Sequence, residues 1–343
     1  MAPQASAVDK SNLFIPLIDF SSFLHGTPIE RAQAAQAVLR GFQTAGFLYL
    51  KNFDIDSSAV QHAFATSADF FKRPQAEKDG LAWTTPASNR GYVAHGREKV
   101  SCLASAEDVA ALKASNPDLK ESFEIGREGE KGHPNHWPGS DVGADAKATQ
   151  FKDVMLDFHD RCKRLHVEVM RAIAVGMGLD EHFFDSYTDV GDNTLRLLHY
   201  PSVPKAVFAA NKQQVRAGEH TDYGSITLLF QDNRGGLQVK SPDGTFVDAT
   251  PIPGTVVVNA GDLLARWSND TIKSTLHRVV EPVTNGILDG EEYPARYSMA
   301  YFCNPNFKDH IEAIPGTYGQ SEQKKYEGIN SGEYLVQRLT ATY

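Results

Sequence analysis

Two stretches of sequence decide the fold: Ala217-Gly-Glu-His220-Thr-Asp222-Tyr-Gly224, and farther along the chain Lys273-Ser-Thr-Leu-His277-Arg-Val-Val280. Both are typical of extended chain, in which residues two apart point to the same face. His220 and Asp222 therefore share a face, and His277 begins a second strand. Two imidazoles and one carboxylate on one side of a metal form the facial triad that suits Fe(II) and leaves positions open for other ligands. The pattern predicts an iron site made by His220, Asp222 and His277.

The H-x-D pattern is not specific by itself. The chain has 12 His and 43 acidic residues, so an isolated H-x-D is expected by chance. Ten histidines lie outside the predicted triad. Among them, we expect His95, His133, His136 and His199 to be surface, loop or structural residues. The metal interpretation therefore depends on what accompanies the triad.

The stretch Glu292-Tyr-Pro-Ala-Arg296-Tyr-Ser298-Met-Ala300-Tyr-Phe302 accompanies it. Alternation places Arg296, Ser298, Ala300 and Phe302 on one face of a strand. A buried guanidinium needs a partner, and no acidic residue lies on that face of the strand. A bound dicarboxylate would pair with Arg296 in a bidentate fashion, and Ser298 would add a hydrogen bond. The alternative is an ordinary salt bridge from Arg296 to a neighbouring strand.

Short apolar runs surround these motifs after about residue 192. They are TLRLLHY, VRAGEH, SITLLFQ, GLQVK, TFVDA, TVVVNA, LHRVVE and RYSMAYF. Gly, Pro, Asp and Asn separate them, which is the pattern of an antiparallel sandwich or barrel. One helix is expected to interrupt the strands, opening at Gly261-Asp262.

The first half of the chain reads mainly as helix. Helices are predicted over 30–44, from an N-cap at Asp56 through Phe71, and over 147–177; a strand is predicted over 47–50. The fold class is therefore α+β, a double-stranded β-helix (jelly-roll) core with a helical N-terminal half packed around it. We expect an N-terminal region of helices and first strands over 14–145, a long scaffold helix within 146–190, a catalytic core over 191–310 and a helical tail over 311–343. The tail, helical over 326–342, either covers the site or forms a subunit contact.

Composition and charge exclude several classes of protein. The chain has 343 residues, 41% hydrophobic and 22% charged, with a formal net charge of −9. This charge argues against nucleic acid or an anionic membrane as the main partner. No run approaches the length of a membrane span, and the polar start lacks the features of a signal peptide. Three scattered cysteines (Cys102, Cys162, Cys303) indicate a reducing, cytoplasmic home, with Cys303 as apolar filler.

The order of motifs resembles one known family, the isopenicillin N synthase-like branch of the 2-oxoglutarate/Fe(II) dioxygenases. The likeness runs through IPLIDF, GFLYLKNF, NRGY, KESFEIGRE, NHWP, GEHTDYGSITLLFQD, GGLQVK, VVVNAGDLLARWSND, STLHRVV and YFCNP. It implies Fe(II), 2-oxoglutarate and O2 as reactants, with succinate and CO2 as co-products and ascorbate as a candidate stimulant. It also implies that the Tyr200 hydroxyl assists the 2-oxo acid carboxylate. One departure is Leu198-His199-Tyr200-Pro201, where plant members carry Asn-Tyr-Tyr-Pro.

Four residues are candidates for substrate binding. Arg196 shares a face with Tyr200, Phe302 shares the Arg296 face, Tyr223 follows Asp222, and Asn89 precedes the turn at Gly91. Two rings with an Arg and an Asn suit a small, flat, polar heterocycle such as a nucleobase. The whole-chain pattern is most similar to the fungal thymine dioxygenases, which implies oxidation of the methyl group of a free pyrimidine base. In the alternative, the rings of Phe302 and Tyr223 only pack the interior of the barrel, and Arg196 pairs with Glu219 or Glu124.

Three other functions stay open at this point. One is an oxygenase of fungal secondary metabolism that acts on an alkaloid, terpenoid or peptide. Another is an oxidase that does not use 2-oxoglutarate. The third is a catalytically silent binding or scaffold protein that keeps the jelly roll. The sequence leaves the oligomeric state open as well.

Overall fold

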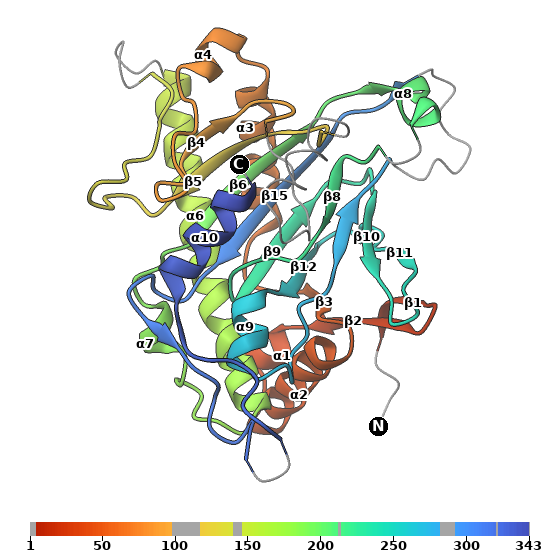
Figure 1. The fold of residues 1–343 in the computed structure, drawn as a ribbon, viewed down its shortest axis with the longest axis vertical. Helices are drawn as coiled ribbons and strands as arrows, with labels where there is room; N and C mark the ends of the chain where they lie inside the picture. The colour runs from red at the N-terminus through yellow and green to blue at the C-terminus, as the bar shows by residue number, and fades with distance from the viewer. Residues whose placement is uncertain are drawn as a thin grey trace.

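A computed structural model describes residues 5–97, 117–139, 146–211, 214–281, 292–319 and 322–342. Cys102 lies outside these ranges. Two β-sheets form the centre of the described molecule (Figure 1). The larger has nine strands, in the order β1 (Ser6–Lys10), β2 (Leu13–Asp19), β3 (Phe47–Lys51), β12 (Thr255–Ala260), β9 (Ile226–Gln231), β15 (Arg296–Cys303), β6 (Thr194–Tyr200), β5 (Glu121–Gly126) and β4 (Gly91–Val93).

The smaller sheet has four strands, in the order β11 (Phe246–Asp248), β10 (Leu237–Lys240), β13 (His277–Val279) and β8 (Ala217–His220). Two short pairs complete the described strands, β14 (Glu292–Tyr293) with β7 (Val203–Pro204), and β16 (His310–Ile311) with β17 (Ile329–Asn330). The strand runs expected after residue 192 are confirmed, with bounds that differ by one or two residues at most ends.

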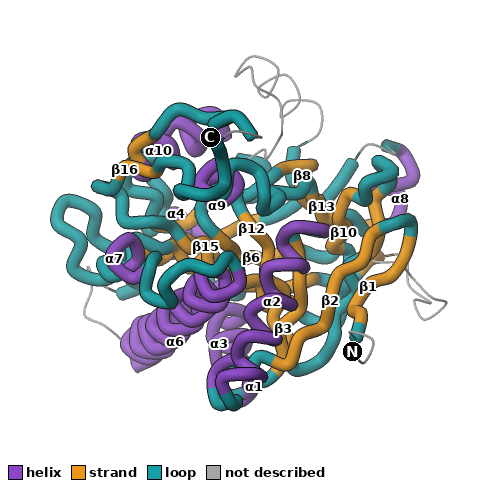
Figure 2. Tube along the Cα trace, turned by 90° about the horizontal axis from the view of Figure 1, so that it is seen from below, coloured by secondary structure: helices purple, strands orange, loops and turns teal. Residues whose placement is uncertain are grey.

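Helices cover one face of the large sheet. The described helices are α1 (Ser21–Leu24), α2 (Pro28–Thr44), α3 (Ser57–Phe71), α4 (Gln75–Asp79), α6 (Ala146–Gly176), α7 (Asp185–Thr188), α8 (Lys205–Ala210), α9 (Asp262–Trp267) and α10 (Ser331–Thr342), of which α2, α3 and α6 make up most of this layer. Figure 2 shows α2, α3 and α6 packed side by side beneath the strands. The predicted jelly roll with helices packed around it is confirmed. No helix among the described residues is both long and apolar enough to cross a membrane.

Local signals in the sequence set the helix ends. Thr27 and Glu30 form a capping box at the start of α2, with Pro28 in the first turn. Gly46 follows the end of α2 with a φ of 70°, a left-handed conformation that glycine adopts without strain. The expected N-cap, Asp56, occupies its position before α3 but makes no side-chain capping hydrogen bond.

Two expectations about the elements need correction. The N-terminal half supplies five strands, β1 to β5, to the large sheet, whereas the sequence located only the β3 span among the first strands expected there. The tail helix begins at Ser331, because Ile329 and Asn330 pair as β17 with β16 instead of continuing the helix. β5 and β17 pair with strands outside their own stretch of sequence, so no local pattern predicts them, whereas β1 and β2 form a local hairpin that the prediction missed.

Strand alternation gives the molecule two hydrophobic layers. Val256 and Val258 of β12 belong to the layer between the large sheet and the helices, whereas Val257 belongs to the layer between the two sheets. Met299 and Tyr301 of β15 lie in the helix layer. The opposite face of each strand is left for the residues that line the space between the sheets, where the candidate site lies.

A buried polar cluster ties the first strands to the core on the helix side of β5. The Glu121 carboxylate accepts hydrogen bonds from Lys78 (2.8 Å) and from the Tyr92 hydroxyl, and lies 2.7 Å from Nδ1 of His199. Burial raises the pKa of Glu121, but the hydrogen bonds outweigh burial and lower it to about 2. The ionised carboxylate is therefore favoured by folding.

Glu121→Gln is expected to lower the free energy of unfolding by about 3 kcal/mol near neutral pH, from 1.36 kcal/mol per pKa unit. Because the folded pKa is depressed, the stabilisation is present above the unfolded value of 4.5 and is lost as pH falls towards 2. Denaturant unfolding of both proteins between pH 7 and pH 3.5 measures this. The difference should shrink with acidification, and a difference independent of pH would contradict it. Glu77→Gln, in an exposed pair with Arg73, is the control and should change stability little.

Candidate functional site

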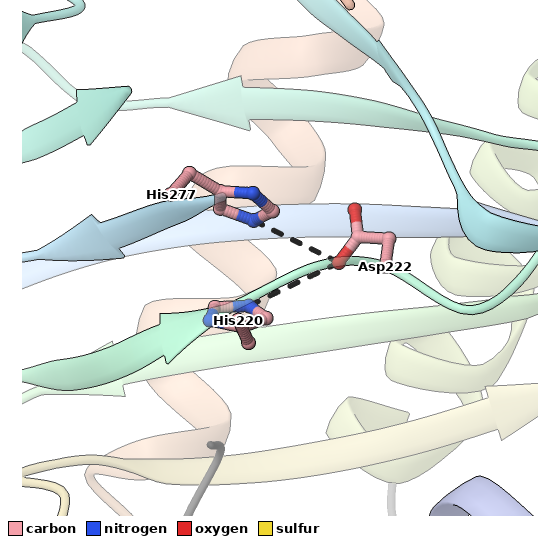
Figure 3. Close-up of side chains that lie close together, drawn as sticks. All are labelled: His220, Asp222 and His277. Carbon is pink, nitrogen blue, oxygen red and sulfur yellow. Dashed lines mark ion pairs between the residues drawn. The ribbon is translucent and has the colours of Figure 1, made fainter. Parts of the chain in front are cut away.

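The structure brings His220, Asp222 and His277 together between the sheets. His220 ends β8, His277 begins β13, and the two residues are paired in the small sheet. Oδ1 of Asp222 lies 3.9 Å from Nε2 of His220 and 3.7 Å from Nε2 of His277. One ligand atom from each residue lies within 4.8 Å of the others (Figure 3). The three side chains therefore converge on one point, as the sequence predicted.

The hydrogen bonds around the triad determine which ring nitrogen of each histidine is free to bind a metal. Nδ1 of His220 lies 2.7 Å from the Gly218 carbonyl oxygen, and Nδ1 of His277 lies 3.2 Å from the carbonyl oxygen of Thr275. A carbonyl only accepts, so Nδ1 carries the proton and Nε2 presents its lone pair. This arrangement of the outer ring nitrogen is the usual one for a metal-ligating histidine.

Asp222 is held by the large sheet. Its Oδ2 accepts from the Thr227 hydroxyl (2.5 Å) and from the Asn259 amide (2.7 Å), while Oδ1 faces the imidazoles. Thr227 on β9 and Asn259 on β12 are opposite each other in the strand register. The carboxylate is thus oriented with one oxygen secured and the other directed at the metal position.

Burial, followed by the proximity of His277, lowers the pKa of His220 to about 3. Burial raises the pKa of Asp222, but the two imidazoles and the hydrogen bonds to Oδ2 outweigh it and keep the pKa below its ordinary value. His220 is therefore neutral and Asp222 ionised at neutral pH, as metal ligands must be. Donor set, orientation and protonation all fit iron(II).

A cavity between the sheets joins the triad to the predicted 2-oxo acid anchor. Arg296, Ser298 and Tyr200 line it together with the three metal-site residues. Arg296 is buried, and its guanidinium donates to the Gly235 carbonyl (2.8 Å), the Ser298 hydroxyl (3.0 Å) and the Gln231 side-chain oxygen (3.2 Å). No carboxylate of the described residues forms an ion pair with Arg296, so the alternative of an ordinary salt bridge is not supported there.

One further cation, Arg216, lies near Arg296 but is not among the residues that line the cavity. Arg216 is fully buried and donates to the Pro294 carbonyl at 2.9 Å, while its Nε and Nη1 have no hydrogen-bond partner among the described residues. Burial, followed by the charge of Arg296, lowers the pKa of Arg216 to about 10. This end of the site is therefore electropositive and suits an anion.

A second cavity adjoins the triad and contains all four predicted substrate residues. Asn89, Arg196, Tyr223 and Phe302 line it together with His220 and Asp222, so the structure places them next to the metal position. The Trp83 indole donates to Oδ1 of Asn89 at 3.0 Å. What Asn89 offers a ligand is consequently its amide nitrogen, a donor.

Arg196 both lines this cavity and has a partner. Its Nε lies 2.7 Å from Oε1 of Glu124, a fully buried carboxylate that also accepts from Ser122 at 2.9 Å. The pairing with Glu124 that was an alternative is therefore present, whereas Glu219 pairs with Arg278. The Arg196 guanidinium lies 5.0 Å over the centre of the Phe302 ring. The ion pair holds the guanidinium at the cavity wall.

The tail covers this second cavity. Leu335, Leu339 and Thr342 of α10 form part of its lining, and the Tyr223 hydroxyl is hydrogen-bonded to the Thr342 hydroxyl at 2.8 Å. The guanidinium of Arg338 lies 4.6 Å over the Tyr223 ring. Of the two roles considered for the tail, covering the site is the one that the lining residues of this cavity support.

Sequence reasoning missed several residues of the site. Asp262 accepts from Thr221 beside the triad and from Ser274 before His277, and it also pairs with Arg338 of the tail. The others are the Asp222 partners, Thr227 and Asn259, and the cavity residue Lys120. Thr227 and Asn259 lie on strands, where alternation restricts each residue to one of two faces. Which face points inward depends on the register between strands, and a single sequence does not reveal it.

Comparison with known proteins identifies the class. Residues 191–305 match the 2OG-Fe(II) oxygenase superfamily, and residues 15–140 match the N-terminal region of the non-haem dioxygenases in morphine synthesis. The chain belongs to the 2OG-Fe(II) oxygenase superfamily and is a 2-oxoglutarate-dependent dioxygenase that uses Fe(II). The silent scaffold considered above is therefore not supported.

The solved structure of the full-length thymine 7-hydroxylase of Neurospora crassa, with alpha-KG and thymine, is similar over its whole length. It shares 62% sequence identity with a TM-score of 0.90, covering 99% of this chain and 100% of that one. A 2-oxoglutarate-Fe(II) type oxidoreductase of Metarhizium rileyi is 34% identical over 95% of this chain and 90% of its own. A proline hydroxylase of Petromyces alliaceus is 33% identical over 95% of this chain and 98% of its own.

Proposed function

We propose that this enzyme hydroxylates the methyl group of free thymine and carries the oxidation on towards 5-hydroxymethyluracil, 5-formyluracil and uracil-5-carboxylate. One observation carries the proposal: the cavity beside the triad is lined by Asn89, Arg196, Tyr223 and Phe302. The resemblance to the thymine complex of the Neurospora crassa hydroxylase, at 62% identity, supports the same substrate.

We assign the cofactor roles as follows. His220, Asp222 and His277 hold iron(II) through two Nε2 atoms and Oδ1. Arg296 and Ser298 bind the distal carboxylate of 2-oxoglutarate, with the Tyr200 hydroxyl beside them. Iron and 2-oxoglutarate, when bound, supply the chemistry that activates O2 and places an oxygen atom on a nearby C–H bond. The chain itself contributes orientation and an enclosed pocket that excludes water.

The substrate residues match the edges and faces of a pyrimidine. The Asn89 amide and the Arg196 guanidinium are donors, which suit the two carbonyl oxygens of thymine. Phe302 and Tyr223 offer rings on which a flat base stacks. Contacts from Arg196 and Arg338 already hold these rings in place. The base is thereby held beside the iron position, and its methyl group supplies the C–H bond that is oxidised.

The occupant is a free base rather than nucleic acid. The tail helix α10 covers the cavity, which leaves no open groove there for a polynucleotide strand. The net charge of −9 is also opposite to what a phosphate backbone requires.

Cys162 and Cys303 are buried and unpaired, which supports a reducing, cytoplasmic compartment.

A second candidate function, oxidation of a small molecule other than thymine, has some support. The proline hydroxylase and other fungal relatives, at 30–34% identity, favour an oxygenase that acts on a different small molecule. The pocket disfavours a proline-containing substrate, because two aromatic rings and two donors suit a flat heterocycle better than a saturated ring. Thymine is therefore the first compound to test.

Thymine is expected to drive succinate formation in the presence of the full chain, iron(II), 2-oxoglutarate and oxygen, with 5-hydroxymethyluracil detected by mass spectrometry. Uracil, which lacks the methyl group, is the compound control and should give no hydroxymethyl product. Succinate formation that does not respond to thymine would eliminate the substrate proposal and leave the enzyme class intact.

The same assay tests the pocket. Phe302→Ala should lower kcat/KM for thymine by roughly tenfold to a hundredfold, because stacking of a base on an aromatic ring contributes about 1–3 kcal/mol. Phe246→Ala is the matched control. Phe246 lies on β11, under the cations Lys240 and Arg278 and away from the cavity, so its loss should leave kcat/KM unchanged.

A further inference from the structure

The lysine at position 120 lies in an unexpected place. Lys120 is buried, and it lines the cavity between the sheets that also contains the triad and Arg296. A buried ammonium is costly unless it is paired or serves a ligand. Its carboxylate neighbour, Asp118, lies 3.8 Å from Nζ and accepts from the Gly218 backbone N–H at 3.2 Å. Stabilising Asp118 is therefore one role for this lysine, and the cavity indicates another.

The strand register shows where the ammonium stands. In the antiparallel pair of β5 with β6, Glu124 is opposite Arg196, and Ser122 is opposite Leu198. Lys120 directly precedes β5, and the same register continued by one residue puts it across from Tyr200; both residues line the cavity. Residues opposite each other share a face of the sheet. The alternate residue Glu121 points to the helix side, where it meets Lys78.

The next strand extends this row. Tyr200 of β6 is opposite Arg296 of β15. Tyr200 and Arg296 are neighbours on adjacent strands, Lys120 lies at the start of the third strand, β5, and all three line the cavity. Neighbouring strands are about 4.8 Å apart, so the two cations start roughly 10 Å apart with the tyrosine between them. Both side chains are long enough to meet at a carboxylate placed above the tyrosine ring.

Arg296 by itself leaves such a carboxylate incompletely bound. A guanidinium has five N–H donors, and three of them bond to Gly235, Ser298 and Gln231. Two donors remain, one on each terminal nitrogen, which is the fork that binds a carboxylate. An ionised carboxylate has about four acceptor sites, so it has capacity for a further donor.

We propose that Lys120 is a second cationic ligand of the distal carboxylate of 2-oxoglutarate, acting with Arg296 from the opposite side of Tyr200. Because its charge is directed at the group that distinguishes 2-oxoglutarate from monocarboxylic 2-oxo acids, Lys120 determines cosubstrate specificity as well as affinity. The inference rests on the use of 2-oxoglutarate and is independent of the thymine proposal.

The test is a cycle of two proteins and two ligands. Calorimetry of the full chain, loaded with iron(II) without oxygen or thymine, measures the dissociation constants of 2-oxoglutarate and of 2-oxopentanoate. The second ligand replaces the distal carboxylate with a methyl group and keeps the iron-chelating end. Lys120→Met should weaken 2-oxoglutarate binding by about tenfold to a hundredfold and change 2-oxopentanoate binding by less than about threefold.

Two results would overturn the proposal. An unchanged affinity for 2-oxoglutarate means that Lys120 only stabilises Asp118. Equal weakening of both ligands means that the substitution damages the iron site or the cavity as a whole. Because failure is read from 2-oxo acid binding, it stays distinct from failure of the thymine assay.

Matched variants distinguish a loss of 2-oxoglutarate selectivity from a folding defect. Lys78→Met removes the other buried lysine of this region, on the helix side of β5, and should reduce stability with no change in the ratio of the two dissociation constants. Lys120→Gln keeps a polar end if Met is not tolerated, and the same loss of selectivity is expected. Lys120→Arg keeps the charge and should retain most of the selectivity for 2-oxoglutarate. A selective loss in Lys78→Met as well would contradict the proposed role.

Discussion

Replacing Asp222 with alanine is expected to abolish iron binding and turnover. The substitution removes the carboxylate whose Oδ1 stands 3.9 and 3.7 Å from the two imidazole nitrogens, and it leaves the donors Thr227 and Asn259 without their acceptor. Loss of a partner outside the ligand set alone typically costs about 10–100-fold, so loss of the ligand itself should exceed about a thousandfold. Iron content after dialysis and thymine-dependent succinate formation measure the two effects.

The surrounding residues supply graded controls for that result. Asn259→Leu keeps the ligand and removes one of its supports, so iron affinity should fall by about 10–100-fold. His199→Gln removes a histidine that is bound to Glu121 on the opposite face of β6, and iron affinity should not change. Stoichiometric iron in the Asp222→Ala protein would contradict the ligand assignment.

The parts of the fold that could be predicted are those where a local pattern is enough. The β12 run alternates between two apolar layers, and α2 carries its own capping box and a terminal glycine. β5 shows the limit. All six of its residues are buried although two are glutamates, because Glu121 and Glu124 find cationic partners far away in sequence. A segment with two acidic residues does not read as buried until those partners are known.

The residues of the site also fall into two groups, those that a local pattern reveals and those that it does not. His220, Asp222 and His277 were found because their chemistry is specific and their spacing is visible along the chain. Lys120 and Asn259 were not found, since their relevance comes from the register between strands. Arg196 is an intermediate case. Its face was predicted correctly, but only the structure shows that Glu124 holds it there.

Arg296→Leu is expected to raise the 2-oxoglutarate concentration needed for half-maximal turnover by about a hundredfold or more while iron binding stays intact. The Arg296 guanidinium lines the cavity and has one donor left on each terminal nitrogen for a carboxylate, and deleting one partner of a buried charge pair costs about 3–5 kcal/mol. The substitution also leaves Gln231 and the Gly235 carbonyl without a donor. Initial rates at varied 2-oxoglutarate, together with iron content, measure the effect.

The choice of control decides what the Arg296 result means. Arg278→Leu removes an arginine of β13 that bonds to Gln238 and Glu219, close to His277 in sequence but outside the cosubstrate cavity. A general loss of packing or of positive charge would affect both variants, whereas loss of the carboxylate anchor affects only Arg296→Leu. If the Arg296 variant kept the wild-type requirement for 2-oxoglutarate, the distal carboxylate would have to bind elsewhere. Arg216, buried with two nitrogens lacking partners among the described residues, would then be the first position to replace.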